Sequence, residues 1–181
     1  MKILTVSDIH GSMKYAHYIQ EAMEYHQADH LLLLGDYLYH GPRNPLPEDY
    51  DPSQVLQFLN SLKSKIIAVR GNCDSEVDQM VLEFTMMQDS TLISLGHRQI
   101  FASHGHLYNP QHLPPLNPHD VFIFGHVHLP IAKKEKEIYI LNPGSLSLPK
   151  ENNPNSYGLL TETEFIIYDL NHCAIKQIAF D

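Results

Sequence analysis

Five short polar clusters in this sequence combine carboxylate, amide and imidazole side chains, the groups that hold divalent metal ions in proteins. They are Asp8-Ile9-His10, Gly35-Asp36, Gly71-Asn72-Cys73-Asp74, His104-Gly105-His106 and Gly125-His126-Val127-His128. A single such cluster is a weak signal, because Asp-x-His and Gly-Asp are common in ordinary turns. Five of them in one chain favour a site with two metal ions.

The mixture of oxygen and nitrogen donors narrows the choice of metal. Carboxylates, an Asn carbonyl and several imidazoles argue against a Ca²⁺ cage of oxygens and against a thiolate zinc site. We expect two divalent ions, with manganese favoured and zinc, iron, cobalt or nickel as alternatives. Two ions about 3.5–4 Å apart can clamp the attacking and leaving oxygens of a displacement at phosphorus and lower the pKa of a bridging water.

The elements that must position these clusters alternate between strand and helix over the first 70 residues. Apolar runs predict strands at 2–6, 31–34 and 65–69, and apolar residues at i, i+3 and i+4 predict a helix over 13–27. A second helix is expected to begin at Asp51-Pro52, because an N-cap residue is followed there by Pro. Residues 37–52 contain four prolines, which predict a loop.

The second half of the chain reads mostly as strand. The expected strands are 91–95, 98–102, 121–124, 137–141, 157–161, 164–168 and 174–180. Gly96-His97 marks a two-residue hairpin turn. Ligands of open α/β sheets bind at the carboxyl ends of strands, and each polar cluster follows an expected strand. We therefore expect one α/β domain over residues 1–181, with two sheets, outer helices and all five clusters at one edge.

Composition excludes several functional classes. Hydrophobic residues make up 43% of the 181 and charged residues 18%, which is typical of a folded domain. No apolar run approaches the ~18 residues of a membrane helix, so no membrane partner is expected. A net charge of -9 opposes nucleic acid as a partner, because nucleic-acid binding needs a basic face. Two cysteines cannot form a disulfide framework, which indicates a cytoplasmic protein.

The order D-x-H, GD, GN-x-D, H-G-H, GH-x-H resembles that of the calcineurin-like metallophosphoesterase family, over residues 8–145. Within the family, the short chain, Gly-Pro-Arg at 41–43 and Asn142-Pro143-Gly144-Ser145 resemble the small bacterial YfcE-type phosphodiesterases. The resemblance implies a four-layer α/β/β/α sandwich of two mixed β-sheets flanked by helices. It also implies a metal-dependent phosphodiesterase that hydrolyses small phosphodiesters, with a metal-bridging hydroxide as the nucleophile.

The family's roles, carried to the matching positions, assign the metal ligands. Each ion would have three ligands of its own: Asp8, His10 and His128 for one, and Asn72, His104 and His126 for the other. Asp36 would bridge the two ions, where its negative charge offsets their repulsion. His106 is expected in or near the metal site, or as a partner that orients His104. Asp74 either bonds His104 or His10, or caps a short helix that begins near Ser75.

Position 73 departs from the family, which usually has His there as general acid to the leaving group. Cys73 is open to three functional readings: a thiol donor that stabilises phosphate, a weak general acid, or a small side chain that widens the pocket. A merely packed cysteine is the plain alternative. We favour the phosphate donor, acting with Asn72 and with Arg43, whose guanidinium suits bidentate contact with phosphate oxygens. The alternative for Arg43, and for His40 beside it, is a solvated loop position.

Two other functions fit the same residues. A phosphomonoesterase or nucleotide pyrophosphatase would use the same ligands on nucleotide-like substrates, although the lack of His at position 73 favours diesters. A non-catalytic scaffold, such as the retromer subunit that resembles this family, would alter the metal ligands, and here the set is complete. A homo-oligomer is a family-level expectation. Tyr37, Leu38 and Tyr39 are expected to be exposed in their loop, as a subunit contact or a substrate wall.

Overall fold

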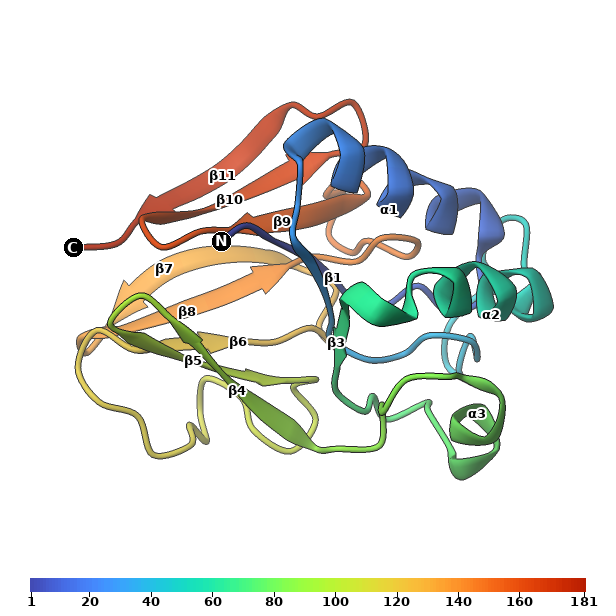
Figure 1. The fold of residues 1–181 in the computed structure, drawn as a ribbon, viewed down its shortest axis with the longest axis horizontal. Helices are drawn as coiled ribbons and strands as arrows, with labels where there is room; N and C mark the ends of the chain where they lie inside the picture. Colours follow the sequence, from blue (N-terminus) through green and yellow to red (C-terminus); the bar gives the residue numbers. More distant parts are fainter.

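Two β-sheets pack face to face in the computed structural model, which describes residues 1 to 181 (Figure 1). The first sheet has the spatial order β11 (Ala174–Ala179), β10 (Glu164–Asp169), β9 (Ser156–Leu160), β1 (Ile3–Val6), β2 (His30–Leu33) and β3 (Ile66–Ala68). The second has the order β4 (Ser90–Leu95), β5 (Arg98–Ser103), β6 (Val121–Ile123), β8 (Ile138–Pro143) and β7 (Pro130–Glu135). Strands β1, β2 and β3 run parallel, as do β5, β6 and β8, and the other pairs are antiparallel. Both sheets are mixed, as the family resemblance implies.

Helices cover the outer face of the first sheet. They are α1 (Met13–His26) and α2 (Pro52–Ser61), and the shorter η1 (Lys63–Lys65) and α3 (Glu76–Val81) complete the helical content. Helix α2 begins where the sequence predicts, because the Asp51 side chain accepts a hydrogen bond from the backbone N–H of Gln54 at 3.0 Å. None of the helices combines the length and the apolar character that a membrane span requires.

Strand β2 shows why its sequence is apolar without interruption. Successive side chains of a strand point to opposite faces, so Leu31 and Leu33 pack under the helices. Leu32 and Leu34 instead join the core between the two sheets, where they meet side chains such as Ile123 of β6. A strand covered on both faces needs apolar residues at every position, and this burial holds the end of β2 firmly in place.

The outer face of the second sheet is covered differently from that of the first. It is covered by the loop of residues 104–120 instead of a helix, with Tyr108 and Leu116 packing against Phe122 and Ile140. The loop contains Pro110, Pro114, Pro115 and Pro118. Proline removes the backbone N–H that a helix needs, so four of them in nine residues prevent helix formation there.

The sequence analysis does not predict strand β7. It reads Pro-Ile-Ala-Lys-Lys-Glu and pairs only with β8, so it is an edge strand. Proline at the start and lysines along its length are typical of edge strands, which must avoid pairing with other chains. The same features weaken the apolar alternation by which a strand is normally recognised.

Candidate metal centre

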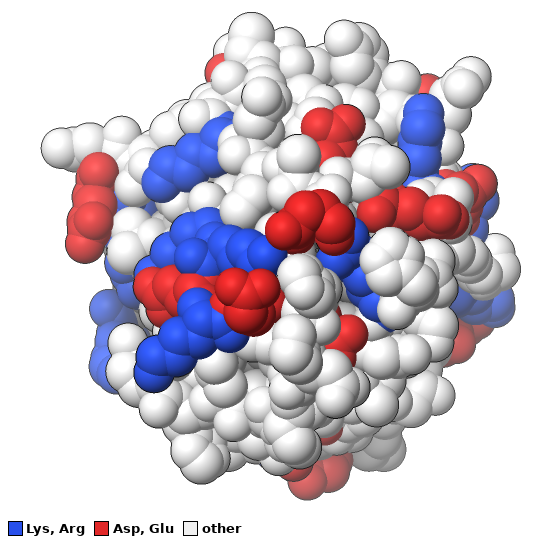
Figure 2. All heavy atoms as spheres, turned by 90° about the vertical axis from the view of Figure 1, so that its left-hand side faces the viewer, with Lys and Arg blue, Asp and Glu red and all other residues white.

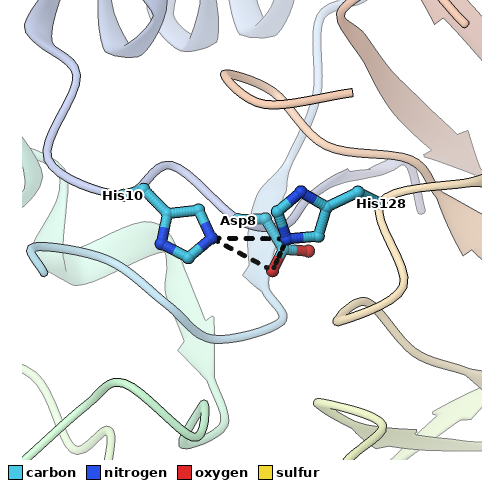
Figure 3. Close-up of side chains that lie close together, drawn as sticks. All are labelled: Asp8, His10 and His128. Carbon is cyan, nitrogen blue, oxygen red and sulfur yellow. Dashed lines mark hydrogen bonds and ion pairs between the residues drawn. The ribbon is translucent and has the colours of Figure 1, made fainter. Parts of the chain in front are cut away.

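The expected polar clusters meet at the carboxyl ends of strands from both sheets. Asp8 and His10 follow β1 and His128 follows β6, and all three side chains are buried. His128 Nε2 lies 3.2 Å from Asp8 Oδ1 and 3.4 Å from His10 Nε2, and His10 Nε2 lies 3.6 Å from Asp8 Oδ1. Figure 3 shows the three side chains turned toward one another.

A second group of donors surrounds His104, which follows β5. Its Nε2 lies 3.1 Å from Asn72 Oδ1, 3.2 Å from His126 Nδ1 and 3.4 Å from Asp36 Oδ2. Asp36 joins this group to the first one, because the same Oδ2 lies 3.7 Å from His10 Nε2. The seven side chains expected to ligate metal therefore form two groups, with a buried carboxylate between them.

Backbone carbonyls fix the orientation of three of the imidazoles. The Nδ1–H groups of His10, His104 and His128 donate to the carbonyl oxygens of Tyr39, Leu34 and Leu148, at 2.9, 2.6 and 2.5 Å. Each Nε2 lone pair then faces the centre, which is the arrangement found around metal-bound histidines. These carbonyls, and not His106, orient the ring of His104.

An unpaired polar atom indicates that these residues can hold a metal ion. Asp8 Oδ1 is buried without a hydrogen-bond partner, and it faces the Nε2 atoms of His10 and His128. Acceptors gathered in this way repel one another unless a cation or a proton lies among them. Donor atoms of Asp8, His10 and His128, and likewise of Asp8, Asp36 and His104, all lie within 4.8 Å of one another.

Electrostatics keep the carboxylates ionised in spite of their burial. Burial raises the pKa of Asp8, but the adjacent imidazoles of His10 and His128 outweigh it and hold the pKa well below its usual value. At His104, burial lowers the pKa while the hydrogen bond and charge of Asp36 raise it, and the net result is a pKa of about 9. The centre thus concentrates negative charge where cations bind.

The backbone around these ligands is strained. Five of the residues have positive φ: Asp8 (57°), His10 (50°), Asp36 (58°), His126 (65°) and His128 (60°). Residues other than Gly rarely adopt this left-handed backbone conformation, and each residue that does so costs on the order of 1–3 kcal/mol of stability. Such strain gathers at functional sites, and here it aims side chains from tight turns into one centre.

Two glycines in the motifs are needed for close approach. A Cβ at Gly71 would lie 2.1 Å from Asp36 Oδ1, and one at Gly125 would lie 1.8 Å from Ser7 Oγ and 3.0 Å from Asp8 Oδ2. Both distances are shorter than any real contact, so the strand ends can meet only because these residues lack side chains.

Asp74 occupies a position that the sequence did not predict. Its Oδ2 accepts hydrogen bonds from the backbone N–H groups of Gly71 and Asp36 at 2.7 and 2.9 Å, and its Oδ1 accepts one from Tyr37 at 2.9 Å. It bonds neither His10 nor His104, and α3 is capped by Ser75 with Asp78 instead. Burial first, and the charge of Asp36 second, raise the pKa of Asp74 to about 6. Asp74 therefore ties the turn after β3 to the turn after β2.

His106 lies beside the second group without bonding any of it. Its ring centroid is 5.5 Å from that of His104 and 6.3 Å from that of His126, and its buried Nδ1 has no hydrogen-bond partner. A role for His106 near a metal stays a prediction.

A cavity of about 680 Å³ opens over the centre. As expected, Asn72, Cys73 and Arg43 line it, and so does Lys150, which carried no motif signal. The backbone N–H of Cys73 donates to Asp36 Oδ1 at 2.9 Å, and Asn72 Nδ2 donates to Cys73 Sγ at 3.3 Å. Burial, followed by the charge of Asp36, raises the pKa of the Cys73 thiol to about 12.

The loop after β2 differs from expectation in two ways. Tyr37 and Leu38 are buried, so only Tyr39, at 42% exposed, is a surface residue and a wall of the cavity. His40 does not line the cavity, because its ring packs between those of Tyr39 and Tyr50, with centroids 4.9 and 5.3 Å away.

The loop at Asn142–Ser145 supports the centre from behind. Asn142 Nδ2 donates to the carbonyl oxygen of Gly125 at 2.8 Å, and Ser145 Oγ donates to that of Asp8 at 3.0 Å. The loop therefore holds the backbone that carries Asp8 and His126 in place, although it does not line the cavity.

Known proteins resemble this chain over its full length. The model of the calcineurin-like phosphoesterase superfamily domain matches residues 1–164. Phosphodiesterase YfcE of Escherichia coli (strain K12) is 46% identical over 182 residues, which cover 100% of this chain and 99% of the relative. The solved structure of Yfce, described as a phosphoesterase from E. coli, covers 100% of both chains with a TM-score of 0.98. Vacuolar Protein Sorting 29 from Cryptosporidium parvum shares the fold, with a TM-score of 0.64 at 18% identity over 99% of this chain and 97% of its own.

Proposed function

The chain belongs to the calcineurin-like phosphoesterase superfamily, and we propose that it hydrolyses small phosphodiesters with the help of two divalent metal ions. Membership of this superfamily implies divalent metal ions. The identity over the full length with a relative named a phosphodiesterase supports diesters as the substrates. The observation that carries the proposal is the pair of donor groups around Asp36, with Asp8 Oδ1 buried and unpartnered between two imidazoles.

In this proposal each donor group holds one ion, and manganese is the favoured metal. Asp8, His10 and His128 would hold the first, Asn72, His104 and His126 the second, and Asp36 would contact both. When bound, two such ions lower the pKa of a water and stabilise charge on the oxygens at phosphorus.

The cavity residues have separate tasks. Asn72 and Cys73 lie beside Asp36 and present an amide and a thiol to the phosphate, and Arg43 enters the cavity from the loop after β2. Asp74 and the loop at 142–145 touch no substrate, and they hold the turns that carry the ligands.

The test is an activity assay with defined metals. Metal-stripped protein is refilled with Mn²⁺, Zn²⁺, Fe²⁺, Co²⁺, Ni²⁺ or Mg²⁺ and assayed with bis(p-nitrophenyl) phosphate and p-nitrophenyl phosphate, beside Asp36→Asn. We expect diester turnover that requires metal, peaks with Mn²⁺, exceeds monoester turnover and disappears in Asp36→Asn. Monoester turnover above diester turnover would favour the phosphomonoesterase. No turnover by folded, metal-loaded protein would favour a scaffold.

Three further expectations stay predictions. A single domain over residues 1–181 is consistent with the shared edge of both sheets, on which the centre lies. A cytoplasmic location is proposed from the cysteine content alone. A homo-oligomer is proposed from family resemblance alone.

A further inference from the structure

Two cations in the cavity have no partner within the protein. Arg43 and Lys150 are the only Lys or Arg residues among its walls, and Asp36 is the only carboxylate. Neither cation forms an ion pair, and neither side chain donates a hydrogen bond to another residue of the chain. Although the chain has 21 acidic and 12 basic residues, the cationic side chains among the cavity walls outnumber the carboxylates.

At another end of the molecule, several cations are matched by acids. Figure 2 shows the end of the molecule where the C-terminus lies, and there blue and red side chains alternate. The ion pairs of this region include Lys133 with Glu135 at 2.6 Å and Lys134 with Asp181 at 3.0 Å. The unpaired cations of the cavity are thus a local departure from the pattern seen at the opposite end.

The two cations reach the cavity from different loops. Arg43 follows Gly41, whose loop passes so close to Cys73 that a Cβ at Gly41 would lie 2.9 Å from Cys73 Sγ. Lys150 belongs to the loop between β8 and β9, and its backbone N–H donates to the carbonyl oxygen of His128 at 3.2 Å. One cation therefore enters beside Cys73 and the other beside the first donor group.

A simple phosphodiester carries too little negative charge to balance both cations. Two dications, the carboxylates of Asp8 and Asp36 and a hydroxide nucleophile together leave one positive charge, which the single charge of a phosphodiester neutralises. Arg43 and Lys150 add two more positive charges at the mouth. A diester with uncharged arms leaves both of them unmatched, whereas a second phosphate on one arm pairs with both.

We propose that Arg43 and Lys150 bind a second phosphate on the substrate, so that the enzyme prefers diesters with a phosphorylated alcohol, such as a nucleoside bisphosphate ester. The proposal rests on the proposed function for its reaction, but the binding of the second phosphate is separate from catalysis. The cavity volume of about 680 Å³ is of the size that holds a nucleotide.

The kinetic test compares two chromogenic diesters that differ by one phosphate: the p-nitrophenyl ester of thymidine 5′-phosphate, and the same ester with a 3′-phosphate. The readout is the ratio of their kcat/KM values, in wild type, Lys150→Gln, Arg43→Gln and the double variant. We expect wild type to prefer the 3′-phosphorylated ester, by roughly fivefold for each cation at low salt. Each single variant should lose part of the preference, and the double variant all of it. Lys136→Gln is the matched control, because this lysine lies in the turn between β7 and β8, outside the cavity, and should keep the ratio.

Calorimetry separates the binding claim from the hydrolase claim. Thymidine 3′,5′-bisphosphate should bind the protein, with and without Mn²⁺, more tightly than thymidine 5′-phosphate, and the double variant should lose the difference. If that preference appears while no diester is hydrolysed, the second-phosphate site stands and the proposed function is wrong. If diesters are hydrolysed but the 3′-phosphate changes neither kcat/KM nor affinity, or if the double variant keeps the preference, the second-phosphate site is wrong.

Discussion

At the residue scale, Cys73 is the cavity side chain whose chemistry bears most directly on the leaving group. Its thiol is half-buried beside Asp36, and its pKa of about 12 makes it a poor proton donor at neutral pH. A thiol in this position can still donate a weak hydrogen bond to a phosphate oxygen. Leaving groups that need no proton should therefore depart most easily from this site.

A series of aryl phosphodiesters tests this role. We expect kcat/KM to fall steeply as the pKa of the leaving phenol rises, because Cys73 supplies little acid catalysis. Cys73→Ala should keep that slope and lower kcat/KM by about fivefold, the effect of one hydrogen bond of about 1 kcal/mol. A flat dependence in wild type, or a steeper slope in Cys73→Ala, would show that the thiol is a general acid.

Asp74 should be a major structural residue of the centre. In Asp74→Asn, an amide NH₂ replaces one of the oxygens that accept from Gly71, Asp36 and Tyr37. We expect unfolding free energy to fall by about 2–3 kcal/mol, because buried N–H groups lose their acceptor. Affinity for Mn²⁺ should fall as well.

Asp78→Asn is the control for this prediction, since Asp78 caps α3 through Ser75 and faces no metal ligand. It should cost about 1 kcal/mol and leave Mn²⁺ affinity unchanged. Equal effects of the two variants on Mn²⁺ affinity would contradict the role given to Asp74.

Motif chemistry alone was sufficient to predict which donors meet, because Asp8, Asp36 and His104 each follow an apolar strand. The position of Asp74 was not predictable, since two of its three partners, Asp36 and Tyr37, are backbone amides of a turn distant in the sequence. Lys150 was missed because a lone lysine after Pro149 resembles any exposed loop residue.

At the scale of elements, the turn after β3 must pass against the turn after β2. Gly71→Ala should abolish Mn²⁺ binding at the Asp36 position, because the new Cβ would displace Asp36 Oδ1.

Gly96→Ala, in the β4–β5 hairpin, is the matched control. The φ of 62° at this position strains Ala, but the atom nearest to the new Cβ belongs to Glu162 and is 3.4 Å away. It should cost about 1 kcal/mol of stability and leave metal binding intact. Calorimetric titration with Mn²⁺ distinguishes the two, and intact binding in Gly71→Ala would be a contradiction.

Helix α1 and strand β9 are joined through a buried histidine. His26 is only 8% exposed, and its Nε2 lies 3.0 Å from the Tyr157 hydroxyl, which lies 2.6 Å from His172 Nδ1. Burial, followed by the charges of His172 and Lys2, lowers the pKa of His26 to about 4. The folded protein thus holds His26 neutral at a pH where the unfolded chain protonates it.

This coupling predicts acid sensitivity. Stability due to His26 is complete above the ordinary pKa of about 6.5 and is lost as the pH falls toward 4, by about 2 kcal/mol. Urea unfolding of the metal-free protein between pH 7.5 and 4.5 should show a shallower pH dependence in His26→Gln than in wild type. Identical slopes in the two proteins would contradict the assignment.

The elements themselves follow from local sequence wherever apolar spacing is clear, as in α1 and β2. Strand β7 and the loop over the second sheet were not predictable from spacing. In β7 the lysines of an edge strand hide the apolar alternation, and in the loop of residues 104–120 four prolines exclude a helix. Which segment packs on the outer face of a sheet depends on tertiary contacts, and the spacing of apolar residues does not encode them.

At the scale of the whole molecule, the net charge of -9 and the concentrated cations of the cavity act together. The acidic surface opposes long polyanions, while the metal centre and the two unpaired cations attract a small, highly charged anion. The fold gathers these charged groups in one place because turns from both sheets lie at one edge of the molecule.

The central claim is that two ions bind on either side of Asp36. Anomalous diffraction from a crystal soaked in Mn²⁺ tests it most directly. We predict two peaks about 3.5–4 Å apart, one beside Asp8, His10 and His128, the other beside Asn72, His104 and His126. A single peak, or peaks away from Asp36, would contradict the two-metal centre.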